Sequence, residues 1–477
     1  MWCARSAVRN FWELVAVFKG LDMKLSRRGF VLGAALIGVS RPSFASAPVL
    51  QIGTRILDVK GKAAKVYGIV GPTGKSGLEM VLGQRFQFDL QNTLDEETAI
   101  HWHGLTPPAV QDGVPLVSAA ALAAGETRAY DFENLKAGTH WMHSHLGLQE
   151  QKLLAAPLIV LETKTPIFDE QEHVVMLHDF TFREPDEILA ELKADGGAHA
   201  MNNMPGMMMG SDVDYDAILA NDRTLDDPEV LRVQKGGFLR LRIINAASAT
   251  NMWIDLGSLQ GQLLAVDGNT VFPVKGSKFP LGIAQRADIR IALPAGSGAW
   301  PILFQSEGAT LRGGIIIQAG EGKVAKISDQ GEAGAALDLK LESKLKPVAQ
   351  LSLDPVTHTE TVALTGGDDN YAWGFNGKAM MHDVLFSVRQ AERVEVTLQN
   401  TTNMAHPMHL HGHYFKVVGI GGKRIDGAIR DTILVPAGAN VTIQFDANNP
   451  GTWAFHCHHL YHMNSGMMAT MGYVGAA

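Results

Sequence analysis

The sequence predicts an all-β protein built from three similar domains, and two observations carry this prediction. Short stretches of alternating apolar and polar residues recur, each bounded by Gly, Pro or Asn, which is typical of β-strands. Three stretches, "GQRFQFDLQN", "GGFLRLRIIN" and "AERVEVTLQN", share one pattern of a turn, an alternating strand and a final Asn. Their starts lie roughly 150 residues apart, which indicates one strand repeated in three domains.

The elements follow in chain order from the same pattern. The clearest predicted strands are residues 85–92, 238–246, 287–294 and 393–400. One helix is predicted at residues 186–196, "DEILAELKADG". Linkers are expected at Glu162 to Glu172 and at Gly320 to Pro347, so we divide the chain near 165 and 335. The predicted domains are residues 46–165, 166–335 and 336–477, after a leader at residues 1–45.

The leader resembles an export signal. From Met23 it reads "MKLSRRGFVLGAALIGVSRPSFASA", with paired Arg27 and Arg28, a short apolar run and small residues near Ala45. This is the pattern of a twin-arginine signal, and Met23 is the expected true start. The apolar run is too short to span a bilayer, so we expect no stable membrane anchor. The predicted location is the bacterial periplasm, reached through the twin-arginine export machinery.

Charge and cysteine content exclude two classes of protein. The formal net charge is −8, which gives no reason to expect nucleic acid as a partner. The chain has only two cysteines, Cys3 in the leader and Cys457, so it is not a disulfide scaffold. Cys457 is therefore expected to be unpaired.

Eight histidines form four His-X-His pairs. They occur in "HWHG" (101–104), "HWMHSH" (140–145), "HPMHLHG" (406–412) and "HCHHLYH" (456–462). Because side chains alternate along a strand, both members of a pair project to one face. A structural zinc site uses about four ligands, so eight imidazoles indicate a cluster of several metal ions.

Cys457 points to a second kind of metal site. On one strand it must face away from His456 and His458. His406 is an odd number of residues before His409, and His462 follows on the next loop. Two His, a Cys thiolate and a distant Met are the ligands of a blue copper site. One strand is thus predicted to serve two metal sites.

With these motifs in place, the sequence resembles the multicopper oxidases, the family of laccases and bacterial cuprous oxidases. The order HXH, HXH, HXXHXH and HCHXXXHXXXXM is complete from His101 to Met467. The resemblance implies three cupredoxin-like Greek-key β-barrel domains and four copper ions. It implies these ligands: type 1 copper, His406, Cys457, His462 and Met467; type 2 copper, His101 and His409; type 3 copper, His103, His143 and His458 for one ion and His145, His411 and His456 for the other.

Two acidic residues are candidates for a role beside the cluster. Asp112 lies nine residues after His103, where the family has an Asp near type 2 copper, so it is the predicted proton relay; a simple turn residue is the alternative. Asp431 in "RDT" is interpreted equally well as a structural residue, in a turn or beside a ligand, or as a functional residue. Where the family often places a second acid, this chain has Met463, and that leaves the second proton route open.

Methionines suggest the electron donor. The segment "HAMNNMPGMMMGSD" contains five Met between 201 and 209. Met380 and Met381 form another small group with His382, and Met404 lies two residues before the predicted type 1 ligand His406. Thioethers favour Cu(I), so we predict that Met380, Met381 and Met404 bind this substrate. Adaptable packing is the alternative.

The predicted function is an exported oxidase that couples one-electron oxidation of a donor, Cu(I) first, to reduction of dioxygen to water, with a role in copper homeostasis. A laccase-like phenol oxidase is the second choice. A copper nitrite reductase needs no type 3 pairs, and a non-enzymatic envelope protein should have lost ligands. We expect a monomer whose partners are dioxygen and either Cu(I) or a small phenol.

Overall fold

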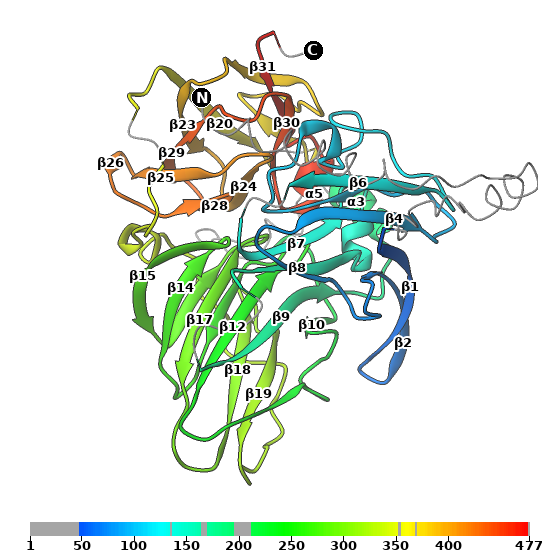
Figure 1. Cartoon of the computed structure of the whole chain (residues 1–477), viewed down its shortest axis with the longest axis vertical. Helices are drawn as coiled ribbons and strands as arrows, with labels where there is room; N and C mark the ends of the chain where they lie inside the picture. Colours follow the sequence, from blue (N-terminus) through cyan, green and yellow to red (C-terminus); the bar gives the residue numbers. More distant parts are fainter. Residues whose placement is uncertain are drawn as a thin grey trace, which may run out of the picture. The chain divides into compact units, whose positions relative to one another are not determined.

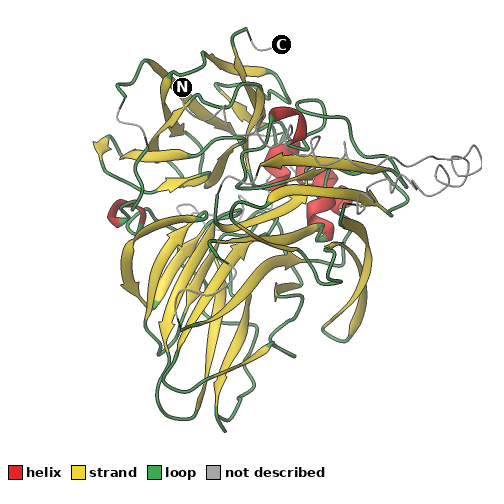
Figure 2. Cartoon of the chain, in the orientation of Figure 1, coloured by secondary structure: helices red, strands yellow, loops and turns green. Residues whose placement is uncertain are grey.

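The fold is almost entirely β-structure. The computed structural model describes residues 47–133, 136–163, 169–194, 211–351, 354–367 and 370–475. Strands run through all of these ranges, and helices are few and short (Figure 2). Within the described residues no helix is both long and apolar enough to cross a membrane. The all-β prediction is confirmed, whereas the predicted leader lies outside the described residues.

The strands form six sheets, which follow one another in three pairs along the chain. The first pair has the strand orders β2-β1-β4-β6 and β3-β8-β7-β5. Its core contains Phe86, Trp102 and Phe132. Its elements are β1 (Val49–Val59), β2 (Lys62–Val70), β3 (Leu78–Val81), β4 (Arg85–Asn92), β5 (Ile100–His101), η1 (Ala109–Gln111), β6 (Thr127–Glu133), β7 (Gly138–Ser144), η2 (Gln149–Lys152) and β8 (Ala155–Leu161).

The second pair of sheets forms the middle third of the chain, green in Figure 1. Its strand orders are β10-β9-β12-β17-β14-β15 and β11-β19-β18-β13-β16, around a core that includes Ile243, Phe304 and Ile317. Its elements are β9 (Gln171–Phe180), α3 (Pro185–Ala194), β10 (Ala217–Ala220), β11 (Val230–Val233), β12 (Phe238–Asn245), β13 (Met252–Asp255), β14 (Gly261–Val266), β15 (Asn269–Gly276), β16 (Lys278–Leu281), β17 (Arg286–Ala292), β18 (Gly298–Ser306) and β19 (Arg312–Ala319).

The third pair has the orders β21-β20-β23-β29-β25-β26, with β27 beside β25, and β22-β31-β30-β24-β28. Phe415, Phe445 and Trp453 belong to its core. Its elements, with the short η3 (Glu342–Lys344) before them, are β20 (His358–Gly366), β21 (Trp373–Phe375), β22 (Val384–Val388), β23 (Arg393–Asn400), β24 (His406–Leu410), β25 (Phe415–Ile420), β26 (Lys423–Arg424), β27 (Ile429–Arg430), β28 (Thr432–Val435), β29 (Asn440–Asp446), β30 (Thr452–Cys457), α5 (Leu460–Asn464) and β31 (Met468–Tyr473). The boundaries near 165 and 335 stay a prediction.

The repeated sequence pattern corresponds to one repeated place in the fold. The three predicted strands are β4, β12 and β23. Each pairs in parallel with the first strand of its sheet pair, namely β1, β9 and β20. Each also pairs antiparallel with a later strand, namely β6, β17 and β29. The alternation of the sequence therefore reflects a strand with neighbours on both edges.

The asparagine that ends each repeated strand fastens the next turn. Asn92, Asn245 and Asn400 are buried. The side-chain amide of Asn245 donates to the carbonyl oxygens of Thr250 and Leu281, both at 3.1 Å. Its carbonyl oxygen accepts from a main-chain N–H two residues later, and Asn92 and Asn400 make the same pattern of bonds. Only an amide both donates and accepts here, which explains why Asn recurs.

We therefore expect Asn245→Asp to destabilise the protein. The carboxylate cannot donate to the carbonyls of Thr250 and Leu281, so two buried acceptors lose their partner, at a loss of about 2–4 kcal/mol in unfolding free energy. Urea unfolding followed by circular dichroism measures this loss. The matched control is exposed Asn448→Asp, for which we expect a change below about 0.5 kcal/mol. Equal losses in the two variants would contradict the proposed fastening role.

Candidate metal centre

Eight histidines reach one place from four strand ends. His101 on β5 lies directly opposite His143 on β7, and His409 on β24 lies directly opposite His456 on β30. Opposed residues of antiparallel strands share a face, about 4.5–5.5 Å apart. The second histidine of each pair lies two residues further on and projects to the same side. These second members are His103, His145, His411 and His458.

A glycine allows the first pair to turn into the site. Gly104 follows His103 with φ +92°, a conformation that side chains rarely adopt. A Cβ atom at this position would lie 2.5 Å from Nδ1 of His140 and 2.6 Å from the guanidinium of Arg286. The "HWHG" motif therefore ends in glycine because two buried side chains occupy the space.

The ring nitrogens of these histidines face one another. Nε2 of His456 lies 3.3 Å from Nε2 of His145 and 2.9 Å from Nε2 of His411. Nε2 of His458 lies 3.3 Å from Nε2 of His143. Groups with one nitrogen from each ring within 4.8 Å of one another include His145 with His411 and His456, His101 with His103 and His143, and His101 with His409 and His411.

The other ring nitrogen, Nδ1, is held by the protein. In His143, His409 and His456 it lies 2.9, 2.8 and 2.9 Å from a main-chain carbonyl oxygen. A carbonyl only accepts hydrogen bonds, so Nδ1 carries the proton and Nε2 presents a lone pair. This is the tautomer that a metal ligand requires, with its N–H donated to the surrounding protein.

Three further nitrogens show that the site fits bound cations. Nε2 of His101, Nε2 of His409 and Nδ1 of His103 are buried with no hydrogen-bond partner among the described residues. In His103 the two nitrogens exchange roles, because its Nε2 lies 3.1 Å from a carboxylate oxygen of Asp431. Lone pairs gathered in a dry interior repel one another, and a metal ion satisfies them. Imidazole donors suit copper, zinc, iron and nickel.

Burial keeps these rings neutral. Loss of solvent lowers the pKa of His456 to about 3. Loss of solvent and the neighbouring imidazoles lower the pKa values of His409 and His411 well below the usual range. The neutral form binds a metal, so the protein presents these ligands without first having to release protons.

The second candidate site lies on the other face of β30, where Cys457 is opposite Met408 on β24. Sγ of Cys457 lies 3.6 Å from Nδ1 of His406 and 3.9 Å from Nδ1 of His462, and the two nitrogens are 3.3 Å apart. Burial raises the pKa of the thiol, so a thiolate here needs a cation beside it. Met467 is also fully buried, and its N–H donates to the carbonyl of His462 at 3.0 Å.

His462 is enclosed on both ring faces and at its edge. Trp373 stacks on it at 3.9 Å between ring centroids, and His459 stacks on it at 3.7 Å. Asp212 places its two carboxylate oxygens 3.3 Å from Nε2 of His462 and 3.1 Å from Nε2 of His459. Tyr371 also donates to Asp212. His462 has no exposed area, so a donor does not touch its ring directly.

Asp212 is a buried negative charge at this edge. Burial alone would raise its pKa, but His459 and His462 hold the pKa of Asp212 well below its usual range. The sequence gives little indication that Asp212 lies at the site, because it is one of several acidic residues that follow the methionine-rich segment. The structure thus identifies a neighbour of His462 that sequence reasoning missed.

Asp112, the predicted proton relay, touches two of the clustered histidines. Oδ2 accepts a hydrogen bond from Nδ1 of His411 at 2.8 Å, and Oδ1 lies 3.2 Å from Nδ1 of His101. The residue is 1% exposed, so it is more than a surface turn. Its role as a relay stays a prediction.

Asp431 also lies at the site, and the middle third of the chain holds it there. Its carbonyl oxygen accepts from His409, and its carboxylate lies against Nε2 of His103. Arg286 on β17 donates to the carboxylate through both terminal nitrogens, at 2.7 Å for the first. The middle sheets place no histidine in the cluster, yet Arg286 fixes the orientation of its neighbour Asp431.

Glu150 was also missed. It is 2% exposed, and its Oε2 lies 3.3 Å from Nδ1 of His143. Burial raises the pKa of Glu150 well above its usual range, with Asp179 adding to the effect. The signal was available in "LQEQ", because a charged residue flanked by two amides follows a ligand pair within one short loop.

The predicted substrate methionines are only partly placed. Met404 is buried two residues before His406, Met380 is half-buried, and Met381 is 48% exposed. The N–H of Met380 donates to the carbonyl of Gly466, next to Met467, so this turn lies beside the Cys457 site. The run from Met201 to Met209 lies outside the described residues.

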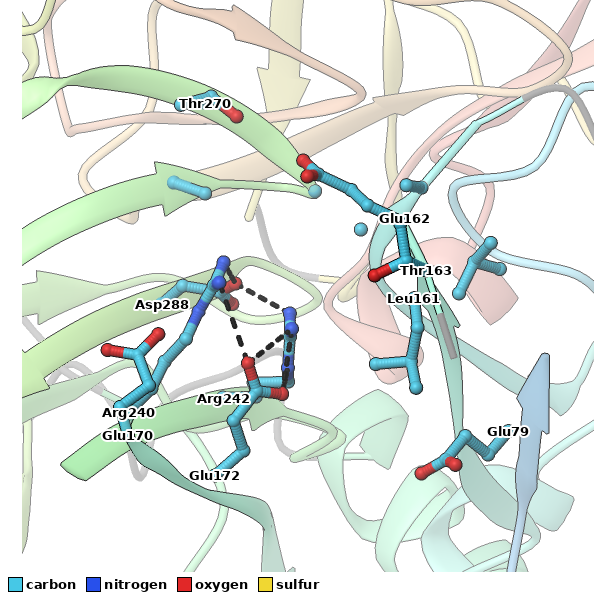
Figure 3. Close-up of a pocket in the computed structure, with 15 residues that line it drawn as sticks. Glu79, Leu161, Glu162, Thr163, Glu170, Glu172, Arg240, Arg242, Thr270 and Asp288 are labelled. Carbon is cyan, nitrogen blue, oxygen red and sulfur yellow. Dashed lines mark hydrogen bonds and ion pairs between the residues drawn. The ribbon is translucent and has the colours of Figure 1, made fainter. Parts of the chain in front are cut away.

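A separate cavity of about 230 Å³ lies between the first and the middle sheets and is drawn in Figure 3. None of its lining residues is a histidine or cysteine. Arg240 and Arg242 face into it, but both pair with Asp288 and Glu172. Its arginine charges are therefore neutralised locally, and it does not form part of the metal centre.

Comparison with known proteins agrees with this geometry. Family models described as multicopper oxidase match residues 53–165, 171–321 and 353–474. Multicopper oxidase MmcO of Mycobacterium tuberculosis is 28% identical over 83% of this chain and 81% of its own length. Copper resistance protein A of Escherichia coli is 25% identical over 93% of this chain and 98% of its own length.

Solved structures share the fold. Fet3p, a multicopper oxidase that functions in iron import, has a TM-score of 0.73 at 20% identity, over 89% of this chain and 90% of its own. The laccase of Botrytis aclada has a TM-score of 0.74 at 21% identity, over 89% and 86%.

The three family models together cover most of the sequence, so the chain belongs to the multicopper oxidase family. It is an oxidoreductase that acts with oxygen, and the family implies copper as the metal. The predicted cupredoxin-like architecture is confirmed by the shared fold.

Proposed function

We propose that the protein holds four copper ions and couples four one-electron oxidations of a donor to reduction of dioxygen to two waters. The ligand sets are those that the sequence predicts: type 1, His406, Cys457, His462 and Met467; type 2, His101 and His409; type 3, His103, His143 and His458, and His145, His411 and His456. When bound, copper would supply the one-electron redox chemistry and the site of dioxygen binding.

One observation carries this proposal. Sγ of Cys457 faces His406 and His462, while the adjacent His456 and His458 turn their Nε2 atoms toward the other histidines. A short covalent path through one strand therefore joins the two ligand sets. The chain's own part is to space the sites, keep water out and present the ligands in the metal-binding tautomer.

We propose Cu(I) as the donor. His462 is closed off by Trp373, His459 and Asp212, which leaves no open face for a bulky phenol. A small soft cation needs less room, and thioethers such as Met381 select Cu(I). Relatives named copper resistance protein A, matching nearly the whole chain, support the same choice. A laccase-like phenol oxidase is the second candidate, favoured by relatives named laccase.

We also propose export to the periplasm by the twin-arginine route, which rests on the pattern of residues 23–47. Replacing Arg27 and Arg28 with Lys should keep the enzyme in the cytoplasm, because this machinery reads the arginine pair. Fractionation followed by an oxidase assay measures the outcome. Unchanged periplasmic activity in the double variant would exclude this route.

Cys457→Ser should abolish the intense visible absorption of type 1 copper and all oxidase activity. Only a thiolate provides this charge-transfer band, and a hydroxyl oxygen is a poor ligand for soft copper. Copper bound by the clustered histidines should remain, because their Nδ1 partners are untouched. Absorption spectra and oxygen uptake check the prediction. A blue band that survives in the purified variant would remove Cys457 from the type 1 site.

Met404→Leu and Met380→Leu should each lower oxidation of Cu(I) several-fold while oxidation of a phenol stays level. Leu keeps the apolar volume but lacks the sulfur lone pairs. Saturation curves for both substrates, at equal copper content, measure the effect. Met176→Leu, buried in the middle sheets, is the matched control. Parallel losses on both substrates would mean that the methionines only pack, and no loss would favour the phenol oxidase.

A further inference from the structure

A second carboxyl group lies against two clustered histidines that Asp112 does not contact. Glu150 is in η2, the short helix that follows the second His-X-His pair. Its Oε2 lies 3.3 Å from Nδ1 of His143, and its Oε1 lies 3.8 Å from Nδ1 of His458. These two histidines face each other through their Nε2 atoms, at 3.3 Å. The carboxyl group therefore lies at the Nδ1 edge of two imidazole rings whose Nε2 atoms face each other.

The helical geometry of η2 explains why Glu150 points inward. In a 3₁₀-helix successive side chains are about 120° apart, so three consecutive residues face three directions. Gln149 faces the first sheets, where its side-chain oxygen accepts from the hydroxyls of Thr98 and Ser144, both at 2.8 Å. Its amide group donates to the carbonyl of Glu97 at 2.9 Å. One end of η2 is thus anchored to the strands that carry His101 and His143.

Gln151 anchors the other end of η2. Its side-chain oxygen accepts hydrogen bonds from the hydroxyls of Tyr215 at 2.9 Å and Tyr461 at 3.1 Å. Tyr215 belongs to the middle third of the chain, and Tyr461 precedes His462 in α5. The two glutamines hold Glu150 between them, so its side chain has little freedom to leave the histidines.

The surroundings of Glu150 indicate no structural role apart from its contacts with the two histidines. Among the described residues, His143 and His458 are the basic side chains within 4.0 Å of its carboxyl oxygens, and burial keeps both imidazoles neutral by lowering their pKa values. A buried carboxylate without hydrogen-bond donors is costly, so a purely structural residue at this place would be expected to be apolar or an amide. Nδ1 of His143 also donates to the carbonyl of Ser144 at 2.9 Å. Nδ1 of His458 lies 3.8 Å from Oε1 of Glu150, which is beyond hydrogen-bond distance, and this buried oxygen has no hydrogen-bond partner among the described residues.

We infer that Glu150 is a positioning residue for the type 3 copper ion that His103, His143 and His458 would hold. Its carboxyl group faces the Nδ1 edges of both rings, beside the carbonyl of Ser144 that already accepts from His143, and so favours the tautomer whose Nε2 atoms are free to bind the metal. This inference rests on the proposed function. It places a carboxyl group beside two rings that Asp112 does not contact, and this group comes from the first domain rather than from the position of Met463.

The test is copper binding by Glu150→Gln and Glu150→Leu. Gln keeps the shape of the side chain, but it has one acceptor oxygen where the carboxylate has two. Its NH₂ group would face an imidazole N–H, and two donors repel each other. Leu removes both acceptors. We expect affinity for the type 3 ion to fall about 10- to 100-fold in both, as for loss of other partners of ligand histidines. Titrating the metal-free protein with copper, followed by electron paramagnetic resonance, should show a copper ion that has lost its magnetic partner.

The matched control is Glu307→Gln. Glu307 is another buried glutamate, 4% exposed, which accepts from Leu337 and Asn251 in the middle of the chain. It should bind copper like the wild type. Thermal unfolding of each metal-free variant separates lost ligation from lost folding, and we expect Glu150→Gln to unfold within a few degrees of the wild type.

The outcomes distinguish the inference from the function on which it rests. Wild type without blue absorption or oxygen uptake would overturn the proposed function. Wild type with both, alongside Glu150→Gln and Glu150→Leu that bind type 3 copper at full affinity, would overturn the inference alone. A new resonance signal from a copper ion without its magnetic partner in both variants, with intact type 1 absorption, supports it.

Discussion

The direction of the imidazole protons is the constraint on which the centre depends. In His143, His409 and His456, main-chain carbonyls take the Nδ1 protons, so the Nε2 lone pairs have no proton to share. They meet at about van der Waals distance in an interior from which water is excluded. Such an arrangement is unfavourable unless a cation occupies the middle. The fold therefore orders these side chains at a cost in conformational entropy, and the resulting site is complete only with metal.

This constraint explains why the middle set of sheets is needed, although the clustered histidines come only from the first and third sets. The first and third sets of sheets bring two pairs of opposed strand ends together. The middle set contributes Arg286, which holds Asp431 against His103 and His409. A buried carboxylate is tolerated because the arginine neutralises it through two hydrogen bonds. The middle sheets therefore act on the cluster indirectly, and the loop before β10 contributes Asp212 beside the Cys457 site.

The enclosure of His462 bears on electron entry. Two rings cover its faces and a carboxylate covers its edge, so in the proposed function an electron would reach the site without direct contact between donor and ring. The negative charge of Asp212 would attract the proposed Cu(I) donor to this edge. The same enclosure keeps water from the thiolate, which protects a reactive sulfur in an oxidising reaction.

The sequence by itself determined the periodic features. Strand alternation identified β4, β12 and β23, and the odd spacing between His406 and His409 separated two ligand faces, because side-chain direction along a strand depends only on position. The tertiary structure decided which carboxylates serve the site. Asp212 lies 250 residues before His462, and Arg286 lies 145 residues before the Asp431 that it orients. Glu150 is close in sequence to His143, but only the packed fold brings it to His458. Their roles arise only when separate sheets pack together.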